Sequence, residues 1–180
     1  MRTFVAIPIP EEIKRKIADI QKSFDLTGIK LVEPQNFHLT VKFFGDLNEE
    51  ELERAENILR NIRSESFDIR IGGINVFPSK SYIRTIWIDV TKNRDKLIAF
   101  LKYVRSHFEG LGKDDKSEII PHLTIGRVKW IENKQELLKR IEKLENVEIG
   151  EMKVDKLVLY KSTLTRNGPI YEAIGEINFG

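Results

Sequence analysis

The sequence predicts an α+β protein with a duplicated, bilobal fold, in which two pseudo-twofold-related lobes, each with an antiparallel sheet and two helices, face each other across a cleft. Three observations lead to this prediction. The tetrapeptide at residues 38–41, His-Leu-Thr-Val, returns almost unchanged at residues 122–125 as His-Leu-Thr-Ile. A similar order of strands and helices surrounds both copies. No Gly- or Ser-rich linker divides the chain, so we expect one domain over residues 1–180, with pseudo-repeats of about 1–82 and 83–180.

The first half begins with an apolar strand at residues 4–7, and Pro10 with two glutamates then opens a helix. One face of that helix carries Ile13, Ile17, Ile20 and Phe24. The first tetrapeptide follows as a strand. Asn48 caps a second helix, which extends to about Ile62, and a further strand covers residues 67–77.

The second half repeats this order. A strand at residues 85–88 precedes a helix whose apolar face carries Leu97, Leu101, Val104 and Phe108. The second tetrapeptide follows, then a helix from Lys134 to about Leu144 and a strand at residues 153–160. Turn residues add two details: Gly72 and Gly73 indicate a β-bulge, and Asn167-Gly168 indicates the tip of a final hairpin.

Composition narrows the class of protein. The chain has 180 residues, of which 41% are hydrophobic and 32% are charged, and it has no cysteine. Disulfides, zinc–cysteine sites and thiol nucleophiles are therefore excluded. The first residues lead directly into a strand and no apolar stretch approaches the length of a membrane span, so we expect a cytoplasmic protein.

The charge distribution favours a cleft that binds an anion. A net charge of +2 is too small for a protein that coats nucleic acid without sequence specificity. Basic residues nevertheless occur in or beside the strands near the two tetrapeptides, whereas most acidic residues fall on helices. A solvated basic rim is the alternative interpretation for each of them. These residues are Lys42, Arg84, Arg127, Lys129, Lys161 and Arg166.

The two tetrapeptides carry the chemistry. Side chains alternate along a strand, so His38 and Thr40 share a face, as do His122 and Thr124. Displacement at phosphorus needs a base and an acid on opposite sides, because the entering and leaving oxygens lie in line. Histidine, with a pKa of about 6.5, can serve as either near neutral pH. The threonine hydroxyls can donate to nonbridging phosphate oxygens.

Other interpretations are less well supported. A single His-x-Thr in a strand is usually structural, but a second copy at a matching place in a repeat favours function. Zinc is disfavoured because no cysteine and no His-Glu-x-x-His spacing accompanies the pair. No Gly-x-Ser-x-Gly elbow, phosphate-binding Gly-rich loop or Lys-x-Asp-Gly motif is present, so neither a serine hydrolase nor use of ATP is expected.

These motifs resemble the 2H phosphoesterase superfamily, and in particular its bacterial and archaeal 2′-5′ RNA ligase branch, the RNA 2′,3′-cyclic phosphodiesterases. The resemblance covers essentially the whole chain. The stretches that carry it are residues 2–7, 36–45, 121–129, 159–162 and 168–172.

The resemblance implies an enzyme that hydrolyses terminal 2′,3′-cyclic phosphates of RNA to 2′-phosphomonoesters without metal, ATP or another cofactor. It also implies that the enzyme joins RNA ends in vitro through a 2′-5′ bond. His38 would be the proton donor to the leaving oxygen and His122 the acceptor from water, an assignment that sequence alone leaves open. Thr40, Thr124 and Arg127 would bind the phosphate. Strict alternation puts Arg127 on the face opposite His122, so this role requires a bulge or a strand end.

The expected partners are RNA ends, including tRNA halves, with no DNA or membrane partner, and a monomer is expected. Two further functions stay open: a phosphodiesterase for small cyclic phosphates of nucleotides or sugars, and a non-enzymatic RNA-end binder. Among the remaining residues, Phe44 shares the predicted face of His38, but we favour packing for it and for its neighbour Phe43. His107 and the two tryptophans, Trp87 and Trp130, are also interpreted as packing, surface or edge residues.

Overall fold

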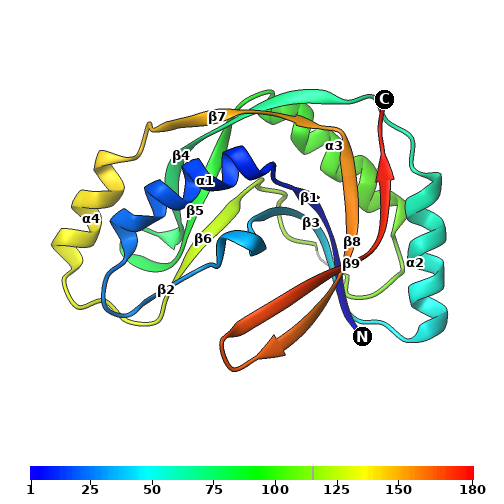
Figure 1. Ribbon diagram of the computed structural model, residues 1–180, viewed down its shortest axis with the longest axis horizontal. Helices are drawn as coiled ribbons and strands as arrows, with labels where there is room; N and C mark the ends of the chain where they lie inside the picture. Colours follow the sequence, from blue (N-terminus) through cyan, green and yellow to red (C-terminus); the bar gives the residue numbers. More distant parts are fainter. Residues whose placement is uncertain (115) are drawn as a thin grey trace.

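Two antiparallel sheets form the two lobes in the computed structural model, which describes residues 1–114 and 116–180 (Figure 1). The first sheet has four strands in the order β3-β1-β8-β9. Its strands are β1 (Arg2–Pro8), β3 (His38–Asp46), β8 (Lys156–Thr165) and β9 (Gly168–Asn178). The predicted α+β fold with two lobes is confirmed.

The second sheet has five strands in the order β2-β6-β5-β4-β7. Its strands are β2 (Ile29–Leu31), β4 (Phe67–Ser79), β5 (Tyr82–Lys92), β6 (Leu123–Val128) and β7 (Glu148–Val154). Strands β6-β5-β4-β7 match β3-β1-β8-β9 in order, and β2 adds an edge strand beside β6. The two His-x-Thr motifs therefore lie on equivalent strands of the two sheets.

Each lobe draws on both halves of the sequence. Strands β8 and β9 join β1 and β3, and β2 and β4 from the first half join the second sheet. The helices cross over as well. Helix α1 (Glu11–Gln21) follows β1 but packs against β7, and α3 (Arg94–His107) follows β5 but packs against β3. The two predicted repeats are therefore contiguous in the sequence, but neither repeat corresponds to one lobe. The boundary between the repeats stays a prediction.

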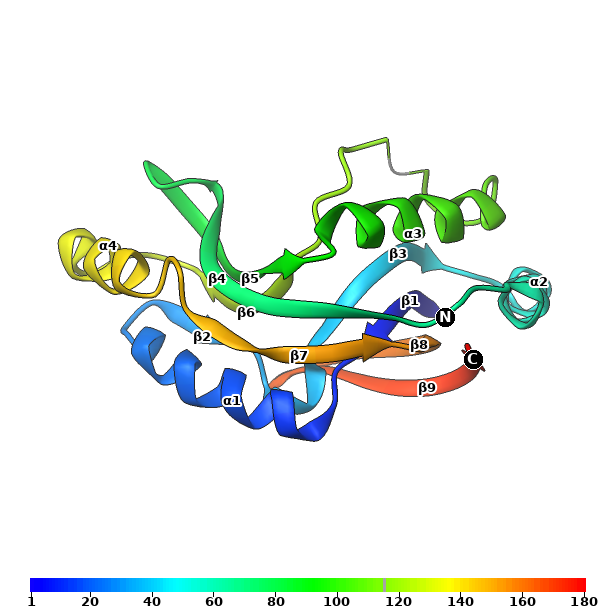
Figure 2. The same ribbon diagram turned by 90° about the horizontal axis from the view of Figure 1, so that it is seen from above.

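The helices begin where the sequence predicts. Helix α2 (Glu49–Asn61) has a capping box, in which Asn48 Oδ1 accepts from the Glu51 amide at 2.8 Å and Glu51 Oε1 accepts from the Asn48 amide at 3.1 Å. Helix α4 (Lys134–Lys143) is capped by Asn133, whose side chain accepts from the Glu136 amide. Helices α1 and α4 lie beside the five-stranded sheet, and α2 and α3 lie beside the four-stranded one (Figures 1 and 2). Two short 3-10 helices, η1 (Lys22–Phe24) and η2 (Pro34–Asn36), flank β2.

The prediction of one strand at residues 153–160 is wrong. The chain leaves the five-stranded sheet after β7 and enters the four-stranded sheet with β8, and Asp155 lies between them. The burial pattern changes at this point: Met152 and Val154 are buried and alternate with exposed neighbours, whereas residues 157–159 are buried in succession. The two strands are separated by a single residue, and extended backbone by itself does not show which neighbour a strand pairs with, so the sequence predicts one strand where the structure has two.

The two predicted turn features are confirmed. The β4–β5 register shifts between Ile71 and Ile74, which makes a bulge at Gly72 and Gly73. Gly73 has φ +82°, and a Cβ on Gly72 would lie 2.6 Å from the carbonyl oxygen of Val147, so neither position tolerates a larger residue without strain. The β8–β9 hairpin turns at Arg166 and Asn167.

One continuous apolar core joins the lobes, and its largest fully buried side chains include Phe24, Phe44 and Phe108. Within residues 1–114 and 116–180, no helix is both long and apolar enough to cross a membrane.

Candidate active site

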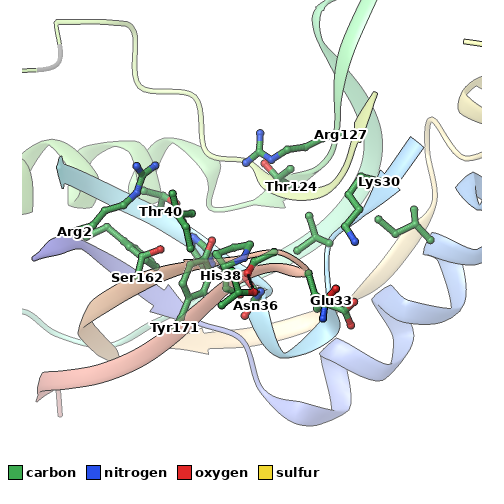
Figure 3. A pocket seen from close by; sticks show the side chains of 18 of the residues that line it. Arg2, Lys30, Glu33, Asn36, His38, Thr40, Thr124, Arg127, Ser162 and Tyr171 are labelled. Carbon is green, nitrogen blue, oxygen red and sulfur yellow. Dashed lines mark hydrogen bonds between the residues drawn. The ribbon is translucent and has the colours of Figure 1, made fainter. Parts of the chain in front are cut away.

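A cavity of about 720 Å³ opens between the lobes. Both His-x-Thr motifs reach it, one from each sheet, and the projecting β8–β9 hairpin forms part of its wall (Figure 3). The predicted site residues that the structure brings together around this cavity are His38, Thr40, His122, Thr124 and Arg127.

His38 is the first residue of β3, and its ring is held on both sides. Nδ1 lies 2.7 Å from the carbonyl oxygen of Asn36 and Nε2 lies 2.9 Å from Thr40 Oγ1. Because a carbonyl can only accept, Nδ1 carries the proton in the neutral ring and Nε2 is the acceptor. The ring also packs against Phe4 and Tyr171, at centroid distances of 4.9 and 5.3 Å.

His122 immediately precedes β6 and is anchored in the same way. Its Nδ1 lies 2.7 Å from the carbonyl oxygen of Ile120, again two residues earlier in the chain. The ring makes edge contacts with Phe77 at 5.2 Å and Trp87 at 5.9 Å between centroids. In both histidines the backbone thus engages Nδ1 and not Nε2; Nε2 of His38 instead has the Thr40 hydroxyl as its partner.

The pKa of His38 is lowered from 6.5 to about 4. Burial of the ring is the main cause, since it penalises the charged imidazolium. The Asn36 carbonyl acts in the opposite direction by accepting from the charged ring, and the positive charges of His122, Arg127 and Lys14 lower the pKa further. The ligand-free site therefore holds His38 neutral at neutral pH.

A β-bulge follows each motif and changes which side chains face the cavity. Between β1 and β3 the register shifts after Thr40, so that Phe43 lines the cavity and Phe44 is buried. Between β5 and β6 it shifts after Thr124, so that Arg127 lines the cavity. This is the bulge that a phosphate-binding role for Arg127 requires.

Only some of the six basic residues named from the sequence reach the cavity. Arg127, Lys129 and Arg166 line it. Lys42 is buried and donates to the carbonyl oxygen of Lys113 at 2.9 Å, away from the cavity. Arg84 and Lys161 are not among its lining residues either.

Sequence reasoning assigned no role to several residues that the cavity contains. Arg2 and Lys30 add positive charge to its wall. Asn36 positions His38 through its carbonyl, and its side-chain amide donates to the carbonyl oxygen of Pro169 at 3.0 Å, which ties β3 to the β8–β9 hairpin. Burial raises the pKa of Tyr171, so its phenol stays protonated beside His38.

The expected packing or surface roles are found for Phe44, Trp87 and His107, whereas Phe43, also expected to pack, lines the cavity. Phe44 makes an edge contact with Phe108 in the core. Trp87 is buried, and Trp130 is exposed just after the end of β6, an inner strand of the five-stranded sheet. His107 ends α3, and its Nδ1 lies 2.8 Å from the carbonyl oxygen of Tyr103.

The described residues contain no group of three or more His, Cys, Asp or Glu side chains that could hold a metal ion. The predicted site residues supply two imidazoles, two threonine hydroxyls and the Arg127 guanidinium, and the other basic residues that line the cavity add further positive charge.

A two-lobed fold with paired His-x-Thr motifs facing one cavity defines a 2H phosphoesterase. The chain belongs to the family described as LigT like Phosphoesterase, whose model matches it twice, over residues 7–87 and 88–171.

The relatives that match this chain along nearly its full length, among them the following two, share one name. The chain is 47% identical to the RNA 2′,3′-cyclic phosphodiesterase of Methanocaldococcus jannaschii, over 98% of this chain and 99% of the relative. It is 40% identical to that of Methanothermobacter thermautotrophicus, over 95% of both chains. Among solved structures, a protein of Thermus thermophilus matches the fold with a TM-score of 0.84 at 24% identity, covering 99% of this chain and 97% of that one.

Proposed function

We propose that this protein is an RNA 2′,3′-cyclic phosphodiesterase that produces a 2′-phosphomonoester. The observation that carries the proposal is the pair of imidazoles with the same Nδ1 anchor, brought to one cavity with two threonines and an arginine. Relatives at 47% and 40% identity that are named for this activity support the choice of substrate.

The reaction divides between the two histidines. His122 Nε2 accepts a proton from water as the water oxygen attacks phosphorus, and His38 Nε2 donates a proton to O3′ as the P–O3′ bond breaks. The 2′-phosphate remains on the ribose. His38 must therefore be protonated in the complex, and the negative charge of the bound phosphate raises its pKa from the low value of the ligand-free site.

Three other side chains bind the phosphate. Thr40 and Thr124 donate hydroxyl hydrogen bonds to the nonbridging oxygens, and Arg127 offsets the charge that develops there. Replacing the water by a 5′-hydroxyl of a second RNA gives the 2′-5′ ligation, since the same P–O3′ bond breaks. No metal and no ATP enter either reaction, because ring strain activates the cyclic phosphate.

We propose cleaved RNA ends, with tRNA halves as one source, as the substrates, and a monomer that works in the cytoplasm, where such ends arise. Size-exclusion chromatography with light scattering tests the monomer.

The experiment is incubation of the purified protein, with EDTA present, on an RNA oligonucleotide that ends in a 2′,3′-cyclic phosphate. Mapping by phosphatase digestion or NMR should find the product phosphate on O2′. A 3′-phosphate would overturn the assignment of O3′ as leaving oxygen. If only mononucleotide cyclic phosphates were hydrolysed, the substrate would be a small cyclic phosphate and not RNA. If the protein bound both substrates but hydrolysed neither, it would be a non-enzymatic RNA-end binder.

A further inference from the structure

Two large aromatic side chains are exposed close to the cavity. Tyr82, at the start of β5, is 61% exposed, and Trp130, just after β6, is 55% exposed. Three exposed basic residues accompany them: Arg84, Lys129 and Lys134. We call these five residues the Tyr82–Trp130 patch.

Side-chain contacts join the patch across two segments of the chain. The Arg84 guanidinium carbon lies 5.7 Å from the centre of the Tyr82 ring, and Arg84 Nη1 donates to the carbonyl oxygen of Lys129 at 3.5 Å. Lys134 Nζ donates to the carbonyl oxygen of Ser81 at 2.9 Å. The patch therefore spans the end of the β4–β5 hairpin, which projects from the five-stranded sheet (Figure 2), and the connection from β6 to α4.

The backbone of Trp130 has a fixed position. The amides of Lys129 and Trp130 both donate to the carbonyl oxygen of Gly28, at 2.8 and 3.3 Å. Gly28 has φ +88°, and a Cβ there would overlap the Trp130 carbonyl oxygen. The close approach thus needs a glycine, and it holds Trp130 beside the end of the cavity wall.

Positive charge continues from the cavity into the patch. Lys129 belongs to both, since it lines the cavity and precedes Trp130. Arg127 lies two residues earlier on β6, and Lys30 of β2 pairs directly with it and also lines the cavity. An anionic chain that begins at the two histidines can therefore follow cations out of the cavity.

The patch also has a free aromatic surface. Within the described part of the chain, the Trp130 ring has neither an aromatic nor a cation partner. At the Arg2 end of the cavity the situation differs, because Arg2 and Lys113 both lie over the Phe43 ring, at 4.9 and 5.7 Å from its centre. A base leaving the cavity therefore finds an open ring at Trp130, whereas the Phe43 ring has two cations over it and the Tyr82 ring has one, Arg84.

Single-stranded nucleic acid is bound by exposed aromatic rings that stack on bases, interleaved with cations that contact phosphates. Nearby acidic residues reduce the charge only in part: Glu132 follows the patch in sequence, and Glu145 pairs with Lys80, which we leave out of the patch.

We propose that the Tyr82–Trp130 patch binds the nucleotides of single-stranded RNA that precede the terminal cyclic phosphate. Bases stack on Trp130 and Tyr82, while backbone phosphates contact Arg84, Lys129 and Lys134. This inference rests on the proposed function, because it assigns a path to the rest of the substrate whose end lies between the histidines. It makes the patch the feature that distinguishes an oligonucleotide from a mononucleotide.

The first test compares kcat/KM for an RNA pentanucleotide and for a mononucleotide, both ending in a 2′,3′-cyclic phosphate. Trp130→Ala and Tyr82→Ala should each lower the oligonucleotide value by about 10- to 100-fold, the effect of losing one stacked base. Mononucleotide turnover should stay at the wild-type value, because neither side chain lines the cavity. Arg84→Ala should also weaken the dependence of oligonucleotide kcat/KM on salt concentration.

Matched controls come from the other lobe. Tyr103→Ala removes a 41% exposed tyrosine of α3, and Arg54→Ala removes an exposed arginine of α2. Both should leave the two substrates unaffected. An oligonucleotide kcat/KM that is unchanged in Trp130→Ala and Tyr82→Ala would overturn the patch while leaving the chemistry in place.

A second readout does not depend on turnover. The chain has two tryptophans, Trp87 buried and Trp130 exposed, and a base stacked on Trp130 should quench its fluorescence. The probe is an RNA pentanucleotide with a terminal 2′-phosphate, titrated into the wild type and into Trp130→Phe. Quenching that is lost in the variant supports the patch even if neither cyclic substrate is hydrolysed, whereas equal quenching in both proteins overturns it.

Discussion

At the scale of single residues, the two histidines have the same backbone anchor but different surroundings. His38 packs against Phe4 and Tyr171 and feels the positive charges of His122, Arg127 and Lys14. The pKa of His38 is consequently about 4 without ligand. In the proposed mechanism, His38 is unprotonated at rest and gains its proton together with the anionic substrate, which would couple binding to acid catalysis.

We expect the His38 titration to respond to an anion. NMR titration of the ligand-free protein should give an imidazole with a pKa of about 4, and saturating inorganic phosphate should raise it. A His38 pKa that phosphate does not raise would contradict the proposed coupling.

The same pKa affects stability. Folding lowers the pKa of His38 from 6.5, so the unfolded chain takes up the proton first as the pH falls. The stability contribution of neutral His38 is full above pH 6.5 and is lost between about pH 6.5 and 4, by about 3 kcal/mol. Urea unfolding across this range should show a shallower acid decline for His38→Gln than for the wild type.

Replacing either catalytic candidate should stop turnover without unfolding the protein. His38→Ala and His122→Ala each remove a proton-transfer group, which is worth about 10²- to 10⁴-fold in kcat. Steady-state kinetics measure the loss, and circular dichroism checks the fold. His107→Ala is the matched control and should retain activity. If either of the first two variants kept wild-type kcat, the acid–base pair would be wrong.

At the scale of elements, β-bulges decide which side chains reach the cavity. Strict alternation from His38 leads to Phe44, but the shift after Thr40 brings Phe43 to the cavity and sends Phe44 into the core. The corresponding shift after Thr124 lets Arg127 line the same cavity as His122 and Thr124. Both bulges occur at equivalent places in the two sheets, so the site is built from a repeated irregularity of the backbone.

The capping box of α2 gives an element-scale prediction. Asn48→Ala removes the side-chain acceptor for the Glu51 amide, which should lower the free energy of unfolding by about 1 kcal/mol. Urea denaturation of the variant and the wild type measures this difference. Asn57→Ala, at an exposed position inside the same helix, is the control and should cost less.

At the scale of the whole molecule, the lobes are interleaved. The chain passes from one sheet to the other several times, and one apolar core joins the lobes. Neither sequence half has a complete sheet of its own. The cavity between the lobes is therefore fixed by the same packing that stabilises them.

Interleaving predicts a single unfolding transition. Scanning calorimetry should give one peak whose calorimetric and van't Hoff enthalpies agree, because neither lobe can lose its structure while the other keeps its sheet. Two resolved transitions would show that the lobes unfold independently. Adding inorganic phosphate should raise the midpoint of the single peak through binding to the folded state.

The sequence by itself determined the element types, the duplicated His-x-Thr motif and the family, because each depends on local periodicity, capping and short-range spacing. Asn48 and the two motifs could be read from a few neighbouring residues. Tertiary structure alone decided that residues 153–160 divide between two sheets and that Phe43 replaces Phe44 at the cavity. It also decided that Arg2, Asn36 and Tyr171 join the site. These features depend on which strands pair and where their register shifts, and strand pairing is set by packing between segments that lie far apart in the chain.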